Sequence, residues 1–127
     1  MNDLLKAPEE LLPARLNGLR VLGEALIELQ RLGFCTSEGT GFTQSDVVYA
    51  TPDDRPYCGY SIQDRENALE QGRLYLSHGP AVRRTLSGRW LDEGLVARTV
   101  VDVLEKKRLK AGWEGSVKTR ILVALDD

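Results

Sequence analysis

Histidine and cysteine are scarce in this sequence: its 127 residues include one histidine and two cysteines. His78, Cys35 and Cys58 are too few and too widely spaced to form a zinc motif, so we expect no metal ion and no other cofactor. The glycine-rich motifs that hold the phosphates of mononucleotides and dinucleotides are also missing. These absences argue against metal-dependent enzymes and against enzymes with a standard nucleotide site.

The sequence also lacks an excess of charge of one sign and a long hydrophobic run. Its 17 basic and 19 acidic residues give a net charge of −2, without the strongly positive field of a general nucleic-acid binder. No segment approaches the roughly 18 consecutive apolar residues of a membrane-spanning helix, and the N-terminus does not resemble a signal peptide. We therefore expect a cytoplasmic protein with no nucleic-acid or membrane partner. Two free thiols fit that compartment, although a disulfide between them stays open.

What is present indicates a single domain over residues 1–127, with residues 1–8 as a flexible end. Leucines recur at spacings of three and four and predict a long helix from about Pro13 to just before Gly33: Leu16, Leu19, Leu22, Leu26 and Leu29. Gly18 and Gly23 lie inside that helix, where each costs about 1 kcal/mol relative to alanine. We expect both glycines to mark places where another element approaches closely.

The middle of the chain alternates between turns and short apolar segments. Residues 35–46 predict a loop, and residues 46–50 and 57–62 predict two strands of a hairpin around a turn that contains Asp53 and Asp54. Ser61 and Asp64 have the spacing of a capping box and predict a short helix that ends at Gly72. Residues 73–78 alternate and predict a third strand.

The last third of the sequence predicts a second long helix and a closing hairpin. Residues 79–94 have no clear pattern, residues 95–109 carry helical spacing, and residues 111–125 read as two strands. The predicted fold is α+β: two long helices and one short helix on a mixed, mainly antiparallel sheet of about five strands.

His78 is the first residue to consider for catalysis, because an imidazole titrates near neutral pH. A catalytic histidine needs a nucleophile within contact distance, and neighbouring Ser77 should point to the opposite face of the strand. Cys35 and Cys58 stay open as partners, but neither lies in a recognisable nucleophile motif. We favour a structural role for His78 and assign no catalytic residue.

Other polar and aromatic residues are candidates for binding. Arg83 and Arg84 could join Arg89 and Arg98 in a patch for an acidic partner, although solvated surface charge explains them as well. Trp90 could anchor an interface if it were exposed, and otherwise belongs to the core with Trp113. The binding candidates are therefore Gln63, Asp64, His78, Arg83, Arg84 and Trp90.

Several motifs in combination resemble an uncharacterised bacterial family that is known as a domain of unknown function. They are Gly59-Tyr60, Gln63-Asp64, the segment GRLYL ending in Gly79, a helix, and a hairpin with Trp113, Gly115, Arg120 and Ile121. The resemblance covers most of residues 16–125. It implies that the position of His78 holds an aromatic ring in relatives, which favours packing. Some relatives carry a cysteine cluster where this chain has only Cys35, so any role of that cluster does not transfer.

Two functional hypotheses follow. The first is a non-enzymatic module that binds and occludes a protein partner, for example a bacterial immunity protein or antitoxin; its basis is small size, acidic balance and the lack of a catalytic constellation. The second is a small enzyme or ligand-binding domain with a cleft around His78 and Asp64. A self-associating module, such as a homodimer, is a third and weaker alternative.

Overall fold

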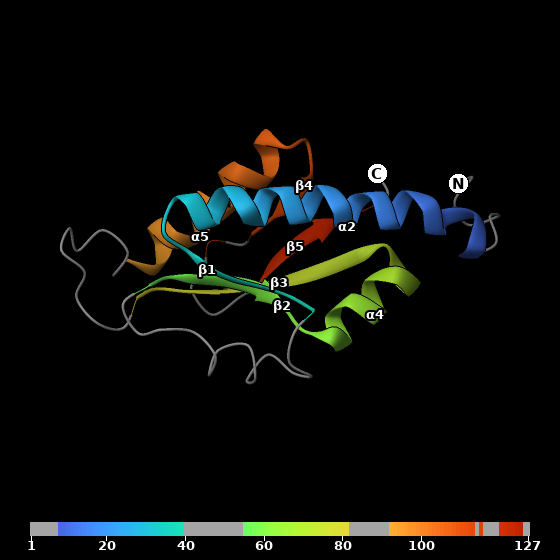
Figure 1. Ribbon diagram of the computed structural model, residues 1–127, viewed down its shortest axis with the longest axis horizontal. Coiled ribbons are helices and arrows are strands. Elements are labelled where there is room, and N and C mark those ends of the chain that lie inside the picture. The colour runs from blue at the N-terminus through green and yellow to red at the C-terminus, as the bar shows by residue number, and fades with distance from the viewer. Residues whose placement is uncertain (1–7, 40–54, 82–91, 114, 116–119, 126–127) are drawn as a thin grey trace.

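The computed structural model describes residues 8–39, 55–81, 92–113, 115 and 120–125 (Figure 1). The elements follow the order α2 (Pro8–Arg31), β1 (Cys35–Glu38), β2 (Tyr57–Tyr60), α4 (Ile62–Gln71), β3 (Arg73–Gly79), α5 (Glu93–Lys106), β4 (Lys110–Gly112) and β5 (Ile121–Ala124). The predicted α+β class with one mixed sheet is confirmed.

The described strands form one sheet in the order β1-β2-β3-β5-β4. Strands β1 and β2 are parallel, whereas the pairs β2–β3, β3–β5 and β4–β5 are antiparallel. Strand β2 lies between β1 and β3. The sequence predicts a hairpin of this strand with the segment 46–50. That segment and the turn with Asp53 and Asp54 lie outside the described residues.

Strand β1 corrects the first part, residues 35–38, of the loop predicted over residues 35–46; residues 40–46 lie outside the described residues. Its sequence, CTSE, has no alternation of apolar and polar residues, so the pattern gives no strand signal. Pairing with β2 makes it a strand: the Cys35 amide donates to the Pro56 carbonyl at 2.8 Å, and the Gly39 amide donates to the Tyr60 carbonyl at 2.9 Å. A partner strand thus overrides a weak local preference.

Helix α2 begins earlier than predicted and ends where predicted. Pro8 rather than Pro13 occupies the first turn, where the missing N–H of proline removes no intrahelical bond, and Pro13 lies inside the helix. At the other end Gly33 has a left-handed backbone with φ of 103°. The Phe34 amide donates to the Leu29 carbonyl at 3.0 Å and closes the helix in the way expected of a glycine at that position.

The core lies between the sheet and the helices α2 and α5, which cover the same face of the sheet (Figure 1). It contains four of the five regularly spaced leucines of α2, together with residues of α5, of β3 and of β5 and the residue after it: Leu19, Leu22, Leu26, Leu29, Val96, Val100, Val103, Leu104, Leu74, Leu76, Ile121, Val123 and Leu125. Leu16 is the exception among the leucines predicted to form the buried stripe, because 44% of its surface is exposed.

Both glycines inside α2 mark close approaches, as predicted. A Cβ atom at Gly18 would meet the backbone of Leu125 and would lie 2.8 Å from the Leu125 Cβ. A Cβ atom at Gly23 would lie 2.8 Å from the Glu38 Oε1. The absence of a side chain at Gly18 therefore lets the Leu125 backbone pack against α2, whereas the absence of one at Gly23 leaves space for the Glu38 carboxylate.

Helix α4 is held by local and long-range polar contacts. The predicted capping box is confirmed: the Asp64 amide donates to the Ser61 Oγ at 3.2 Å, and the Ser61 amide donates to the Asp64 Oδ2 at 3.1 Å. At the other end of α4, the buried Arg15 of α2 donates to the carbonyls of Leu69 and Glu70 at 2.9 and 2.8 Å. These contacts fix the position of α4 relative to α2.

Candidate functional site

His78 is packed in the interior near the end of β3. Only 2% of its side chain is exposed, and its ring meets the Trp113 ring edge to face at a centroid distance of 6.2 Å. Its Nδ1 lies 3.9 Å from the Glu93 Oε1, which is longer than a hydrogen bond. Cys58 is its cross-strand partner on β2. This environment fits the packing role that we favoured for His78.

The thiol next to His78 is poorly suited to act as a nucleophile. Cys58 is fully buried, and burial raises the pKa of its thiol to about 12, so the thiol stays protonated at neutral pH. Cys35 on β1 pairs with Tyr57 on β2, and Cys58 is the residue after Tyr57. Successive residues of a strand point to opposite faces, so the side chains of Cys35 and Cys58 lie on opposite faces of the sheet. Both cysteines are free thiols.

The two residues of the polar pair Gln63 and Asp64 have different surroundings. Gln63 is exposed on α4. Asp64 caps α4 and also accepts from Arg120, whose Nη1 lies 3.1 Å from its Oδ1. The Arg120 guanidinium in turn lies over the Tyr75 ring, 5.1 Å from its centroid. Asp64 thus joins α4 to the sheet.

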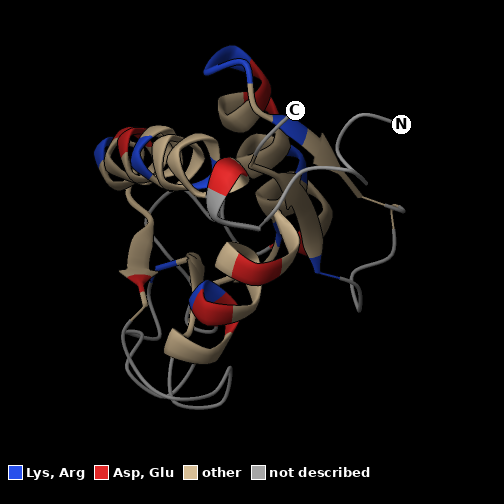
Figure 2. Ribbon diagram, turned by 90° about the vertical axis from the view of Figure 1, so that its right-hand side faces the viewer, with Lys and Arg blue, Asp and Glu red and all other residues tan. Residues whose placement is uncertain are grey.

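The structure does not describe the remaining predicted binding residues. Arg83, Arg84, Arg89 and Trp90 lie outside the described residues, and Arg98 is exposed on α5. Figure 2 shows acidic and basic positions mixed along the helices. Across the described residues, no three histidine, cysteine, aspartate or glutamate side chains are grouped so that they could hold a metal ion. No helix among these residues is long and apolar enough to cross a membrane.

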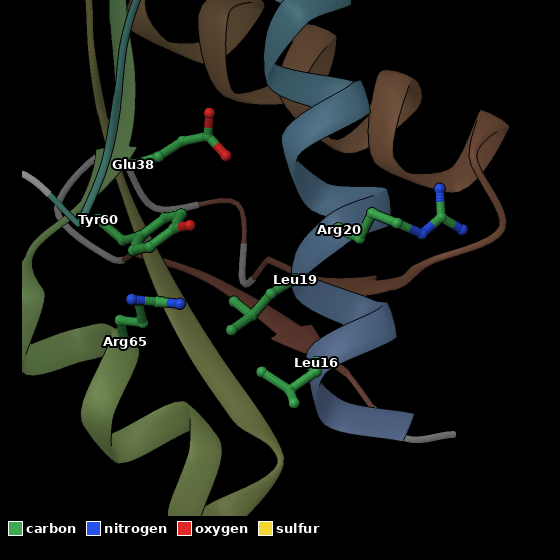
Figure 3. Close-up of a pocket in the computed structure, with 6 residues that line it drawn as sticks. All are labelled: Leu16, Leu19, Arg20, Glu38, Tyr60 and Arg65. Atoms are coloured by element: carbon green, nitrogen blue, oxygen red, sulfur yellow. The ribbon is translucent and has the colours of Figure 1, made fainter. Parts of the chain in front are cut away.

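A hollow of about 370 Å³ lies between α2, the ends of β1 and β2, and the start of α4 (Figure 3). Its lining residues are Leu16, Leu19, Arg20, Glu38, Tyr60 and Arg65. Neither His78 nor Asp64 lines it, so this hollow is not the cleft that the sequence analysis proposed around those two residues. We call it the α2–α4 hollow.

Apolar and aromatic side chains face each other across the α2–α4 hollow. Leu16 and Leu19 point from α2 toward Tyr60 and α4 (Figure 3). Tyr60 is only 4% exposed as a whole residue, and its hydroxyl is directed toward the hollow. Burial, and then the Glu38 carboxylate, raise the pKa of Tyr60 to about 12, while Arg65 acts in the opposite direction. The phenol is therefore a neutral donor at physiological pH.

Two opposite charges accompany the Tyr60 hydroxyl. Glu38 and Arg65 are both exposed, and neither side chain makes a hydrogen bond or an ion pair with another described residue. Arg20 differs from them, because its guanidinium points away from the hollow (Figure 3) and donates to Glu24 at 2.9 Å and to Asn17 at 3.1 Å. The hollow thus combines an aliphatic wall, a phenol, one available carboxylate and one available guanidinium.

Sequence reasoning did not find the α2–α4 hollow, because its residues come from three elements that are distant in the chain. Neither Glu38 nor Arg65 belongs to a motif, and Tyr60 was read as part of a strand. One signal was present. Gly23 was expected to mark a close approach, and the group that approaches it is the Glu38 carboxylate.

Comparison with known proteins identifies a family but no characterised relative. The model of a family described as a domain of unknown function, DUF6891, matches residues 20–126. No curated protein and no solved structure matches the chain significantly. The match spans all the described strands, α4, α5 and the second half of α2, and it bears out the resemblance seen in the sequence. The chain therefore belongs to this family of domains of unknown function.

Proposed function

We propose that this protein is a non-enzymatic module that binds a protein partner through one side of α2. The observation that supports the proposal is an apolar row with spacings of four, three, four and four residues: Leu12, Leu16, Leu19, Gly23 and Ile27. At 3.6 residues per turn, these positions fall within about 80° of one another. We call them the outer row of α2.

Much of the outer row faces solvent. The exposed fractions of Leu12, Leu16 and Ile27 are 38, 44 and 47%. Single exposed apolar side chains are ordinary, but a row of them beside a hollow is the arrangement of an interface with an anchoring pocket. Of this row the core takes Leu19, and the inner leucines of α2 provide most of the helix's contribution to it.

A partner that covers the outer row would be bound without chemistry on either protein. An immunity protein or antitoxin, which neutralises a toxin by occluding it, is the concrete form of this proposal. The two free thiols are compatible with a cytoplasmic location, which we include in the proposal.

Site-specific photo-crosslinking tests the proposal. A photoreactive amino acid is placed at Ile27 in the outer row or, as a control, at Leu95 on α5, where 38% of the leucine is exposed. We expect a discrete crosslinked protein from position 27 and none from position 95. The protein identified should then form a stable complex with the wild-type chain and with Leu95→Glu, but not with Ile27→Glu. Equal crosslinking at both positions, or a complex that tolerates Ile27→Glu, would contradict the proposal.

Ligand binding is the second candidate function, and the α2–α4 hollow is the observation that favours it. The enzyme version of this candidate was a cleft around His78 and Asp64. His78 is buried against the Trp113 ring, and neither His78 nor Asp64 lines the hollow. The hollow is therefore a better basis for a ligand site than the surroundings of His78.

A further inference from the structure

The charges in the α2–α4 hollow are separated by an aromatic ring. Glu38 and Arg65 extend on either side of Tyr60 (Figure 3), and both charges affect the pKa of its hydroxyl. No ion pair joins Glu38 and Arg65 here. Each charge is therefore available to a ligand, and one ligand with two opposite charges would satisfy both.

The rest of the hollow sets the size and polarity of such a ligand. Its volume of about 370 Å³ is near the lower end of the roughly 300–1,000 Å³ range for small-molecule sites. Leu16 and Leu19 provide an aliphatic surface, and the neutral Tyr60 hydroxyl provides a donor. These features fit a compact molecule with an aliphatic part and a polar part.

Glycine at position 23 supports a role for the Glu38 carboxylate. Glycine is unfavourable inside a helix, and a Cβ atom at this position would come within 2.8 Å of the Glu38 Oε1. Gly39, next to Glu38 in sequence, has a different explanation: its φ of 63° lies in the left-handed region, and a Cβ atom there would be at an ordinary contact distance of 3.4 Å from the Arg65 Cδ. Gly23 thus leaves space for one of the two charged side chains that flank Tyr60, the Glu38 carboxylate.

We infer that the α2–α4 hollow binds a small zwitterion of the α-amino-acid class with an aliphatic side chain. The ammonium group pairs with Glu38, and the carboxylate accepts from Arg65 and from the Tyr60 hydroxyl. The aliphatic side chain packs on Leu16 and Leu19. This inference goes beyond the protein-binding proposal and does not depend on it.

Calorimetric titration of the full chain with four matched compounds tests this inference. Leucine carries both charges, N-acetylleucine carries only the carboxylate, leucine amide carries only the ammonium, and N-acetylleucine amide carries neither. We expect leucine to bind most tightly and each lost charge to weaken binding by about tenfold, since each removes a charge-assisted hydrogen bond. Failure of leucine to bind more tightly than the neutral compound would overturn the inference. So would equal binding of leucine and N-acetylleucine, because the site would then read a carboxylate alone.

Substitutions at two exposed residues test which residue binds each charge of the ligand. Arg65→Gln should weaken the binding of leucine and leave that of leucine amide unchanged, whereas Glu38→Gln should weaken leucine and leave N-acetylleucine unchanged. Arg73→Gln and Glu70→Gln change exposed residues outside the hollow and should alter neither affinity. Loss of this pairing between substitution and compound would also overturn the inference. Crosslinking at Ile27 is independent of these titrations, so either proposal can fail alone.

Discussion

The two sides of helix α2 contain the same residue types and have different surroundings. On the inner side Leu22, Leu26 and Leu29 are fully buried. On the outer row Leu12 and Leu16 are 38 and 44% exposed, and they are only one turn apart. The same division holds for arginine. Arg15 is buried and donates to two carbonyls of α4, while the ion pair of Arg20 with Glu24 is exposed.

This difference indicates that one helix has two separate tasks. The inner side provides the burial of apolar surface that stabilises the fold, at roughly 25 cal/mol per Å². The outer row leaves apolar surface in water beside a hollow whose charges have no ion-pair partner among the described residues. Substitutions on the two sides should therefore separate stability from binding.

The largest difference is expected between two leucines of α2. Leu26→Ala should reduce the free energy of unfolding by about 2–5 kcal/mol, because it leaves a cavity in the core. Leu16→Ala should change it by about 0.5 kcal/mol or less, since that side chain is already in contact with water. Urea denaturation of both variants gives the comparison. Similar losses in the two variants would show that the outer row belongs to the core.

A smaller difference is expected between two arginines of the same helix. Arg15→Met keeps most of the side-chain length but removes the bonds to the Leu69 and Glu70 carbonyls, and should cost about 1.5–3 kcal/mol. Arg20→Met removes only an exposed ion pair and should cost at most about 1 kcal/mol. Thermal unfolding followed by circular dichroism measures both. An Arg15 variant as stable as the Arg20 variant would contradict the role of Arg15 in holding α4.

A third expectation concerns Gly18, on the inner side. Gly18→Ala gains about 1 kcal/mol of helix propensity, but its new Cβ meets the Leu125 backbone, which cannot move without distorting β5 and the chain end. Overpacking of this kind costs about 1–3 kcal/mol, so the net effect should be destabilising. A stabilised variant in chemical denaturation would show that the contact with Leu125 is looser than described.

The smallest effect is expected for Glu28, which joins α2 to α5. Its hydrogen bond from Lys106, together with the charges of Lys106, Lys107 and Arg31, holds the pKa of Glu28 below its ordinary value of 4.5. A carboxyl with a lowered pKa stabilises the fold above its ordinary pKa, and that contribution disappears as pH falls through the lowered value. The stability difference between the wild type and Glu28→Gln should therefore be constant near neutral pH and shrink in acid. A difference that does not change with pH would contradict this account.

The sequence predicts the elements that are specified locally. The side chains of Ser61 and Asp64 each accept a hydrogen bond from the other residue's backbone amide. Because both residues lie within one turn, the sequence predicts the start of α4. Gly33 similarly fixes the end of α2. Regular leucine and valine spacing identifies the buried sides of α2 and α5, because burial on one side of a helix leaves a period near 3.6 residues.

Long-range contacts account for what the sequence does not predict. Strand β1 forms because the backbone from Cys35 to Glu38 pairs with β2. The side chains of this segment do not alternate between apolar and polar, so the sequence gives no signal for the pairing. The α2–α4 hollow arises where Glu38, Tyr60 and Arg65 meet α2. A lone histidine such as His78 is conspicuous in a sequence, whereas an exposed glutamate or arginine is not.

Gly23→Ala provides the most direct test of the division of α2 between fold and binding. Its Cβ would meet the end of the flexible Glu38 side chain, which can move away, so the helix should retain most of its gain of about 1 kcal/mol. The free energy of unfolding and the affinity for leucine are measured on the same sample. Our account predicts unchanged or increased stability together with weakened leucine binding. A destabilised variant, or one that binds leucine as tightly as the wild type, would contradict it.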